Sequence, residues 1–266
     1  MAILGAVIGD ILGAQYEFNR PRDLDWEHVE LIGSRGTGFT DDSVMALAIK
    51  EALDKDLDFV STMVRVGKKY PFCGYGTSFY SWINGDRHEP YGSWGNGSAM
   101  RVAYVGEFYE DYEEMQEMAA KTAAVSHDHP EGIKGAVVTA TCIWMARHGK
   151  SRQDIYDYVL QEYPPGEYPY SIDKDLGYLR EHYVWTEKCS DTVPPAMRCF
   201  YESTDYESFI RNIFSLECDS DTFGAIAGGV AEEFYHGLGS VDGEGIAKKY
   251  LTDELYKILI HDLTVE

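Results

Sequence analysis

The sequence predicts an all-α fold, formed by a single helical domain over residues 1–266, and three observations support that class. Apolar residues recur at helical spacing along most of the chain, whereas no sustained alternation of period two indicates a strand. Residues 131–147 are rich in Ala, Val and Ile and poor in charge, which suits a helix at the centre of a bundle. No repeat or linker divides the 266 residues, a length near the upper limit for one hydrophobic core.

In chain order, the predicted helices cover residues 2–16, 43–53, 113–124, 131–147, 153–161, 195–202, 206–216, 222–235 and 253–262. The first carries Gly5, Gly9 and Gly13 at intervals of four residues, which places them on one helix face. In a membrane this spacing favours helix dimerisation, whereas in this chain we expect it to bring a buried helix close to a neighbour. The helices over 43–53 and 222–235 each follow a short acidic motif that offers helix caps.

Two stretches are expected to be irregular. Residues 70–96 repeat Gly and aromatic residues, and residues 163–195 contain Pro164-Pro165-Gly166. Long structured loops within a compact helical domain often carry binding residues, so we expect part of any functional site there.

Composition and charge exclude several classes of function. Hydrophobic residues make up 44% of the chain, too many for a disordered protein. The 23 basic and 45 acidic residues give a formal charge of −22, which repels phosphate backbones and anionic lipid. Broad nucleic-acid binding and membrane binding are therefore not expected. A small anionic ligand remains compatible, because local N–H groups and metal ions can outweigh the global field.

The thiols and the N-terminal segment both suggest a cytoplasmic protein. The five cysteines form no C-x-x-C pair and no zinc spacing, so we expect reduced thiols that pack as small hydrophobic side chains. The apolar run over residues 2–9 lacks a basic lead region, and Asp10 interrupts it. This run is shorter than the roughly 20 residues that span a bilayer, so neither a signal peptide nor a transmembrane helix is predicted.

The motif Thr40-Asp41-Asp42 directly precedes the helix predicted over 43–53. Thr and Asp are ordinary helix caps, and acidic side chains favour the positive end of a helix dipole. Taken alone, this motif is better explained as a cap than as a metal site.

The motif Asp219-Ser220-Asp221-Thr222 stands before another helix and has the same character. Capping uses one or two side-chain oxygens, so the acids and hydroxyls of the two motifs together exceed that need. If the two helix starts converge, their four carboxylates repel one another unless cations lie between them. Ligands that are all oxygen favour Mg²⁺ or Mn²⁺ over Ca²⁺, and the absence of His or Cys disfavours zinc.

Three further segments carry candidate residues, and each has a structural explanation as well. Glu17 lies one turn beyond Gly13, where a solvated acid at a helix end is also expected. Residues 91–101 are small and expose N–H groups at a helix start, which favours a phosphate, although a tight loop has the same composition and no G-K-[ST] follows. His127 and His129 could chelate a metal or form hydrogen bonds, and no G-x-S-x-G elbow accompanies them.

Taken together and in this order, the five segments resemble the ADP-ribosylglycohydrolase family, which includes the dinitrogenase-reductase-activating glycohydrolase. The similarity runs from Gly5 to Gly237 and looks close to compact bacterial members, particularly over residues 93–101 and 126–136. Residues 191–216 are also similar to the family's approach to its second acidic motif. Any one motif is weak, whereas five in register over this length are specific.

The resemblance implies an all-α orthogonal bundle with two Mg²⁺ or Mn²⁺ ions at the base of a cleft. The implied metal ligands are Thr40, Asp41, Asp42, Asp219, Asp221 and Thr222, and the implied catalytic acids are Glu17 and Asp42. Ser220 is expected to point elsewhere. The implied ligand-binding residues are Gly95, Asn96, Gly97, Ser98, Ala99 and Met100 around the diphosphate of ADP-ribose, His127 in the cleft, and Tyr75 and Gly76 in a second loop.

The implied activity is hydrolysis of the bond between ADP-ribose and a protein side chain of the arginine or serine type. The implied partner is an ADP-ribosylated protein or another ADP-ribose conjugate. Three alternatives stay open: a hydrolase of small conjugates such as O-acetyl-ADP-ribose, a non-catalytic ADP-ribose-binding module, and a phosphoesterase that uses the same metals. One departure affects the site, because Glu217-Cys218 stands where the family commonly has two glycines.

Overall fold

The computed structural model describes residues 1–33 and 35–261, and within them it confirms the predicted all-α class. These residues form fourteen α-helices and one short 3₁₀ helix, with only two isolated β-bridges. The helices are α1 (Ala2–Gly13), α2 (Asp41–Asp54), α3 (Phe59–Lys69), α4 (Thr77–Asn84), η1 (Asn96–Ser98), α5 (Ala103–Phe108), α6 (Tyr112–Ala124), α7 (Pro130–Arg147), α8 (Arg152–Glu162), α9 (Leu176–His182), α10 (Cys189–Tyr201), α11 (Tyr206–Phe214), α12 (Ser220–Tyr235), α13 (Gly243–Tyr250) and α14 (Asp253–Ile260).

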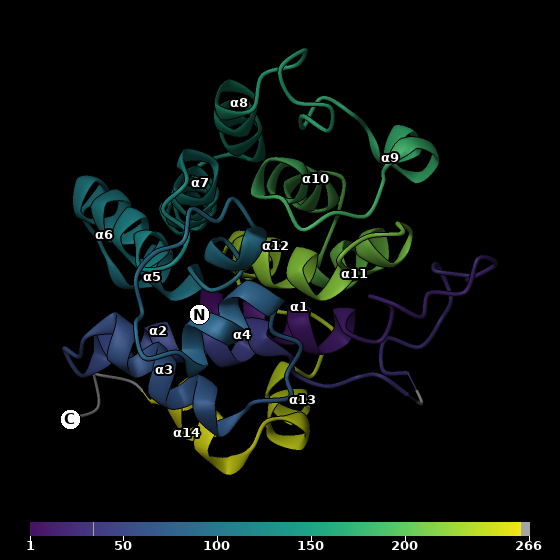
Figure 1. The fold of residues 1–266 in the computed structure, drawn as a ribbon. Coiled ribbons are helices and arrows are strands. Elements are labelled where there is room, and N and C mark those ends of the chain that lie inside the picture. Colours follow the sequence, from purple (N-terminus) through teal and green to yellow (C-terminus); the bar gives the residue numbers. More distant parts are fainter. Residues whose placement is uncertain (34, 262–266) are drawn as a thin grey trace.

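Helix α1 passes through the middle of the bundle beside α12 (Figure 1). The prediction that its glycines allow a close helix contact is confirmed. A Cβ atom placed on Gly9 would overlap the backbone carbonyl of Gly224, and one placed on Gly5 would overlap that of Gly228. Gly224 and Gly228 are equally restricted by α1, so the two helices touch backbone to backbone.

Asp10, the one acidic residue of α1, joins this helix to the start of α2. Its buried carboxylate accepts hydrogen bonds from the N–H groups of Thr40 and Ser43, each at 3.0 Å. The hydroxyls of Thr40 and Ser43 donate to the same carboxylate. Asp10 therefore satisfies the N–H groups of the N-cap residue Thr40 and of Ser43 in the first turn of α2, which have no partner within that helix.

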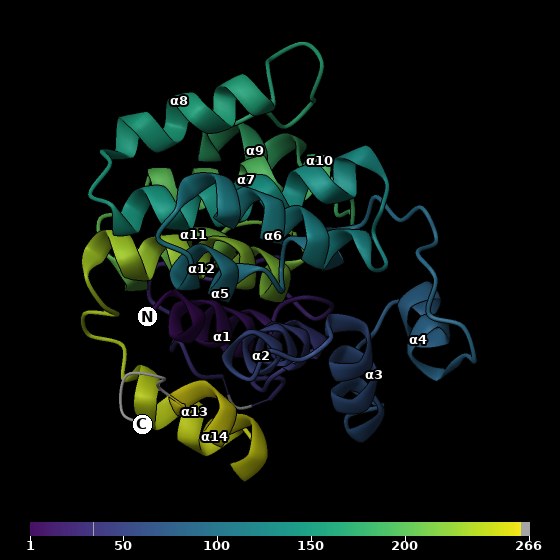
Figure 2. The same cartoon turned by 90° about the vertical axis from the view of Figure 1, so that its left-hand side faces the viewer.

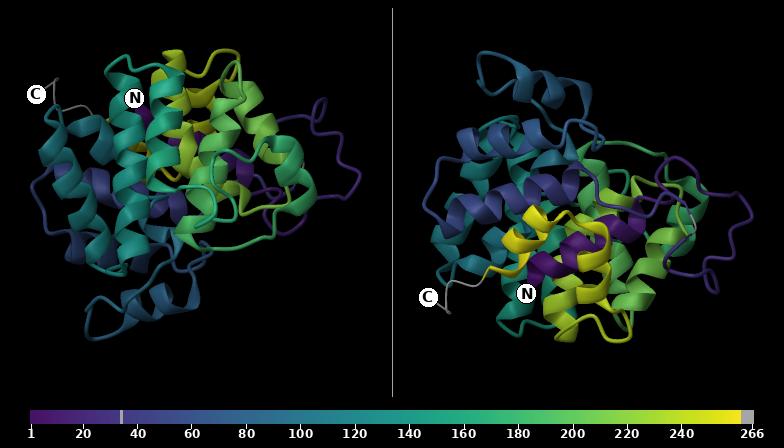
Figure 3. Two further views of the ribbon diagram at one scale, coloured as in Figure 1. Left: turned by 90° about the horizontal axis from the view of Figure 1, so that it is seen from above. Right: turned by 90° about the horizontal axis from the view of Figure 1, so that it is seen from below.

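The remaining helices lie in layers around this central pair. In the side view, α8 lies at one end, followed by α7 and α12, then α1 and α2, with α13 and α14 at the other end (Figure 2). The α4 segment and the loop segments over residues 14–33 and 35–39 extend beyond the packed helices (Figure 3). No helix in the described part of the chain has the length and apolar character needed to cross a membrane.

Several predicted helix boundaries are wrong. The first helix ends at Gly13 instead of residue 16, and turns follow it. Helices α3, α5 and α13 were not predicted, and α4 and α9 lie inside the two stretches expected to be irregular. Helix α3 has its signals in the sequence, since Asp58 caps it and Phe59, Met63 and Val66 are buried at helical spacing. The last predicted helix ends at Ile260, and Asp262 lies outside the described residues.

Helix α10 begins at Cys189, six residues before its predicted start at Pro195. Proline has no N–H to donate to the preceding turn, so it is favoured at a helix start, and a helix that runs on through Pro195 leaves a carbonyl of that turn without its usual donor. In the structure, the hydroxyl of Tyr183 donates to the Asp191 carbonyl at 3.1 Å. This contact replaces the hydrogen bond that Pro195 cannot make, so the helix continues through the prolines.

The backbone contact between α1 and α12 predicts a measurable cost for a single methyl group. We expect Gly9→Ala to lower the free energy of unfolding by about 1–3 kcal/mol, because the new Cβ must push the two backbones apart. Urea denaturation measures this change. Gly38→Ala is the matched control, since a Cβ there meets no atom within 4 Å. Equal stability of both variants would contradict the close packing of α1 and α12.

Candidate active site

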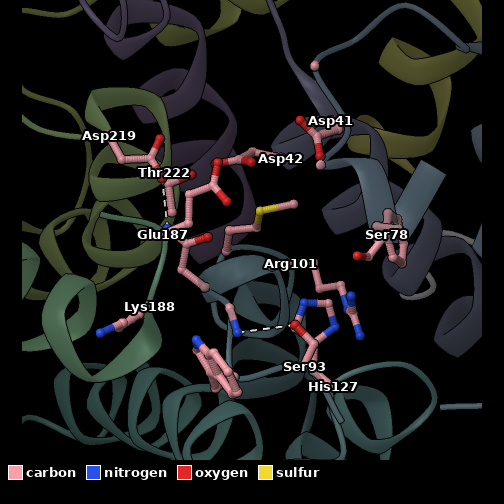
Figure 4. A pocket seen from close by; sticks show the side chains of 18 of the residues that line it. Asp41, Asp42, Ser78, Ser93, Arg101, His127, Glu187, Lys188, Asp219 and Thr222 are labelled. Carbon is pink, nitrogen blue, oxygen red and sulfur yellow. Dashed lines mark hydrogen bonds between the residues drawn. The ribbon is translucent and has the colours of Figure 1, made fainter. Parts of the chain in front are cut away.

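A cavity of about 660 Å³ brings together segments that are far apart in the sequence. The starts of α2 and α12 contribute Asp41, Asp42, Asp219, Asp221 and Thr222, and the loops contribute Glu17, Gly74, Gly76, Tyr91, Gly92, Ser93, Trp94, Gly95, Glu187 and Lys188. The rest of the wall is formed by Thr77, Ser78, Phe79, Asn96, Gly97, Met100, Arg101 and His127. Figure 4 shows the acidic side chains gathered on one side, with Ser93, Arg101 and His127 on another.

Three carboxylates form the densest part of the acidic cluster. One ligand oxygen from each of Glu17, Asp219 and Asp221 lies within 4.8 Å of the others. The side-chain amide of Asn96 donates to Asp219 at 2.7 Å. This hydrogen bond joins the glycine-rich loop (residues 91–101) to Asp219 at the start of α12 and therefore connects the loop to the acidic cluster.

Asp41 and Asp42 approach the same cavity from α2. Asp42 is 2% exposed, and its Oδ2 atom has no hydrogen-bond partner among the described residues. The Asp41 N–H donates to the Cys73 carbonyl at 2.7 Å, which joins α2 to the Gly74–Gly76 loop. A buried carboxylate oxygen without a donor is costly, and a bound cation would compensate it.

The carboxylates shift one another's proton affinity. Burial, followed by the charge of Asp221, raises the pKa of Glu17 to about 9. Burial and the charge of Asp10 raise the pKa of Asp41 to about 8, and burial raises the pKa of Asp219 to about 7. Burial and neighbouring acids also raise the pKa values of Asp42 and Asp221 well above the usual range. Without a cation, this cluster therefore retains protons at neutral pH.

These residues fit a divalent metal. All the clustered donors are carboxylate oxygens, the ligands that Mg²⁺ and Mn²⁺ prefer. Two further observations agree with this fit. The Asp42 Oδ2 atom has no hydrogen-bond partner among the described residues, and burial and neighbouring acids raise the pKa of Asp42, so a cation would stabilise its carboxylate.

The two hydroxyls that flank the acids have different places. Ser220 donates to the Gly13 carbonyl at 2.7 Å and therefore points away from the cavity, as expected. The Thr40 hydroxyl donates to Asp10 at 2.8 Å and accepts from the Asp42 N–H at 3.2 Å, and Thr40 does not line the cavity. Thr40 thus caps α2, and its role as a metal ligand stays a prediction.

The glycine-rich loop pairs with the segment before α10. The Asn96 N–H donates to the Glu187 carbonyl at 2.7 Å, and the Cys189 N–H donates to the Trp94 carbonyl at 3.0 Å. Glu187 and Lys188 reach the cavity through this pairing.

The predicted ligand-binding residues divide between the cavity wall and the layer behind it. Gly76, Gly95, Asn96, Gly97, Met100 and His127 line the cavity. Ser98 and Ala99 lie behind the wall, where the Ser98 hydroxyl donates to the Gly132 carbonyl at 2.6 Å. Tyr75 also lies outside the wall, and its ring is 5.9 Å from that of Phe79.

Sequence reasoning did not assign Asp10, Arg101, Glu187 or Lys188 to the site. Asp10 had a usable signal, since an acid within an apolar helix needs a buried partner. Glu187 and Lys188 had none, because only the pairing with the glycine-rich loop brings them to the cavity. Glu217, which replaces a family glycine, is exposed and does not line the cavity, whereas Cys218 is buried.

The family model for ADP-ribosylglycohydrolases matches residues 1–244. The chain belongs to the ADP-ribosylglycohydrolase family and is a glycohydrolase, which confirms the resemblance seen in the sequence. It is similar to human ADP-ribosylhydrolase ARH3, with 28% identity over 88% of this chain and 84% of that protein. It is also similar to a putative ADP-ribosyl glycohydrolase of Acanthamoeba polyphaga mimivirus, with 25% identity over 88% of this chain and 86% of that protein.

The fold has a solved counterpart. An ADP-ribosylglycohydrolase-related protein complex contains a chain that superposes with a TM-score of 0.72. The match covers 97% of this chain and 93% of that chain, at 24% sequence identity. The fold of this chain is therefore similar to that of the solved chain.

The raised pKa values predict a pH-dependent stability in the presence of a chelator. A carboxyl group with a raised pKa binds protons more tightly in the folded state than in the unfolded state, so stability falls as pH rises from its unfolded pKa to its folded pKa. For Asp219 and Asp41 this window runs from 3.8 to about 7 and about 8. We expect the Tm with chelator to fall across this range, and we expect Mg²⁺ to raise it most at the alkaline end.

Asp221→Asn should flatten this decline, because it removes one of the mutually repelling acids. The exposed Asp86→Asn is the matched control and should keep the wild-type slope. Thermal scans at several pH values, with chelator and with Mg²⁺, separate the two variants. Identical slopes for Asp221→Asn and the wild type would contradict the proposed repulsion.

Proposed function

We propose that this protein hydrolyses the glycosidic bond that joins ADP-ribose to a modified protein side chain. The observation that supports this most is a single cavity with a carboxylate cluster on one side and a glycine-rich loop on the other. A ribose next to the acids and a diphosphate along the loop would use both sides at once. Membership of the ADP-ribosylglycohydrolase family supports the same ligand class.

We propose further that two Mg²⁺ or Mn²⁺ ions bind between the starts of α2 and α12. Asp41, Asp42, Asp219 and Asp221 would supply carboxylate ligands, with Thr40 and Thr222 as the hydroxyl ligands. Such ions, when bound, would orient ribose hydroxyls and stabilise negative charge nearby.

Glu17 would move the proton in this reaction. Cleavage builds positive charge on the ribose ring, and an acidic side chain next to the anomeric carbon can activate water or protonate the leaving group. Glu17 lies in the loop after α1, with a carboxylate oxygen close to Asp219 and Asp221, and it lines the cavity. Asp42 lines the cavity from the opposite helix and would share this role.

The glycine-rich loop would hold the diphosphate. The N–H groups of Gly95 and Asn96 already donate to Ser93 and to the Glu187 carbonyl. The phosphate oxygens would therefore use other donors of the loop, beginning with the Gly97 N–H and the His127 side chain. One hydrophobic core extends from α1 to α14, and we propose on this basis that residues 1–266 form one domain.

The metal proposal predicts that single acids are indispensable. We expect Asp41→Ala and Asp219→Ala each to lower release of ADP-ribose from a mono-ADP-ribosylated protein by at least about a hundredfold, since each variant leaves the remaining acids without a complete cation site. Chelator should abolish wild-type release, and Mg²⁺ or Mn²⁺ should restore it. Full activity in both variants, or an active enzyme free of metal, would refute the metal site.

The role proposed for Glu17 predicts a change in kcat. We expect Glu17→Gln to lower kcat by about 10²–10⁴-fold, because the amide can neither accept nor donate the transferred proton. Affinity for ADP-ribose, measured by calorimetry, should change little. Glu181→Gln, at an exposed glutamate outside the cavity, is the control. A panel of arginine-, serine- and acetyl-linked substrates then identifies the linkage, and wild-type binding without any release would favour a non-catalytic module.

A further inference from the structure

Arg101 is fully buried in a chain with a large excess of acids, yet no carboxylate pairs with it among the described residues. Its Nη2 atom donates to the Thr122 carbonyl at 2.9 Å and the Ala123 carbonyl at 3.4 Å, both at the end of α6. Carbonyls at a helix C-terminus favour a cation, which accounts for part of its stabilisation. The Nε and Nη1 atoms have no partner in the described structure, so burial of this side chain has a cost that packing alone does not offset.

The third partner of Arg101 connects it to the cavity. Its Nη2 atom also donates to the Ser126 hydroxyl at 2.9 Å. The Ser126 oxygen lies 2.8 Å from Nδ1 of His127. Ser126 has one proton to donate, and a buried hydroxyl donates it to an available acceptor. Since a guanidinium can only donate, Nδ1 of His127 is the acceptor that the described residues offer to the proton of Ser126.

This hydrogen bond determines which nitrogen of His127 carries the proton. An imidazole whose Nδ1 accepts a hydrogen bond holds its own proton on Nε2. Burial, followed by the nearby Arg101 charge, lowers the pKa of His127 well below its usual range, which keeps the ring neutral. The rings of Phe79 and Tyr91 pack against it at 6.2 and 5.8 Å and supply no carboxylate.

The Nε2 atom faces the glycine-rich loop. A Cβ atom placed on Gly97 would lie 2.9 Å from this nitrogen, and one placed on Gly95 would lie 3.7 Å from it. His127 and Arg101 both line the cavity, and the Arg101 side chain is fully buried in its wall (Figure 4). The Ser126 hydroxyl joins this guanidinium to the His127 ring.

We propose that Arg101 and Ser126 are positioning residues that hold His127 as the neutral tautomer with its proton on Nε2. The wall of the cavity beside the glycine-rich loop then carries a hydrogen-bond donor without a positive charge of its own. This donor suits an acceptor oxygen of a phosphate group bound along the loop. The identity of that ligand rests on the proposed function, whereas the tautomer does not.

The tautomer can be observed directly by ¹⁵N NMR of the full chain labelled at histidine. We expect the His127 spectrum of the wild type to show a protonated Nε2 and an unprotonated Nδ1. Ser126→Ala removes the hydroxyl that donates to Nδ1, so the two tautomers should become mixed. Ser126→Thr keeps a hydroxyl at the same place and should restore the wild-type spectrum. A wild-type spectrum with the proton on Nδ1, or a Ser126→Ala spectrum identical to the wild type, would overturn the proposal.

Affinity for ADP-ribose separates positioning from simple support of the fold. We expect Ser126→Ala to weaken ADP-ribose binding by about tenfold and to raise KM with kcat nearly unchanged, because the acidic residues are untouched. Ser203→Ala removes another buried hydroxyl, which donates to the Phe200 carbonyl outside the cavity, and should leave the affinity unchanged. Equal losses in both variants, or no loss in Ser126→Ala, would overturn the ligand role of His127.

The two proposals fail in different ways. A wild type that neither binds nor releases ADP-ribose refutes the proposed function. In that case the NMR experiment still decides whether Arg101 and Ser126 set the tautomer. Binding in the wild type with the predicted tautomer, lost together in Ser126→Ala and recovered together in Ser126→Thr, supports both.

Discussion

The backbone contact between α1 and α12 is the constraint on which the rest of the site depends. Because glycines face each other at two levels, the backbones of α12 and α1 are in direct contact, and the Ser220 hydroxyl reaches the Gly13 carbonyl. On the same central helix, Asp10 accepts hydrogen bonds from the N–H groups of Thr40 and Ser43 at the start of α2. One helix therefore orients the starts of both α2 and α12. As a result, carboxylates from both helix starts reach the same cavity. Asp41 and Asp42 belong to the start of α2, and Asp219 and Asp221 belong to the start of α12.

The acidic side chains of the cavity and the nearby Arg101 guanidinium are buried without forming ion pairs with one another, which is electrostatically unfavourable. Acids gather where burial raises their pKa values, and a guanidinium is buried nearby without a carboxylate partner. Pairing Arg101 with one of the acids would relieve both costs, but it would also remove an acid from the cluster. Buried charged groups that do not pair with one another are expected at functional sites, where an arrangement that lowers stability is kept because it serves binding or chemistry. Under the proposed function, the same separation would provide an acidic side for a ribose and a neutral donor for a phosphate.

Helix capping and the proposed metal binding are compatible uses of the same motifs. The Thr40 hydroxyl caps α2 through the Asp42 N–H, which leaves the Asp42 carboxylate free to face the cavity. The Ser220 hydroxyl joins α12 to α1, whereas Asp219 and Asp221 face Glu17. The hydroxyls and the carboxylates can serve these two purposes because neighbouring side chains at a helix start point in different directions. Glu217 and Cys218, which stand where the family commonly has two glycines, lie away from these acids, since Glu217 lies on the surface and Cys218 packs inward.

The sequence by itself determined the all-α class, the family, the close contact of the first helix with a neighbouring helix, and the two acidic motifs that supply the carboxylates of the cavity. These features are local, because helical spacing, glycine spacing and short motifs lie within a few residues of one another. The tertiary structure decided the rest. It carried α10 through Pro195 with a hydroxyl from Tyr183, placed Ser98 and Ala99 behind the wall, and brought Glu187 and Arg101 to the cavity. Each of these depends on a partner that is distant in the sequence, and no local pattern records such a partner.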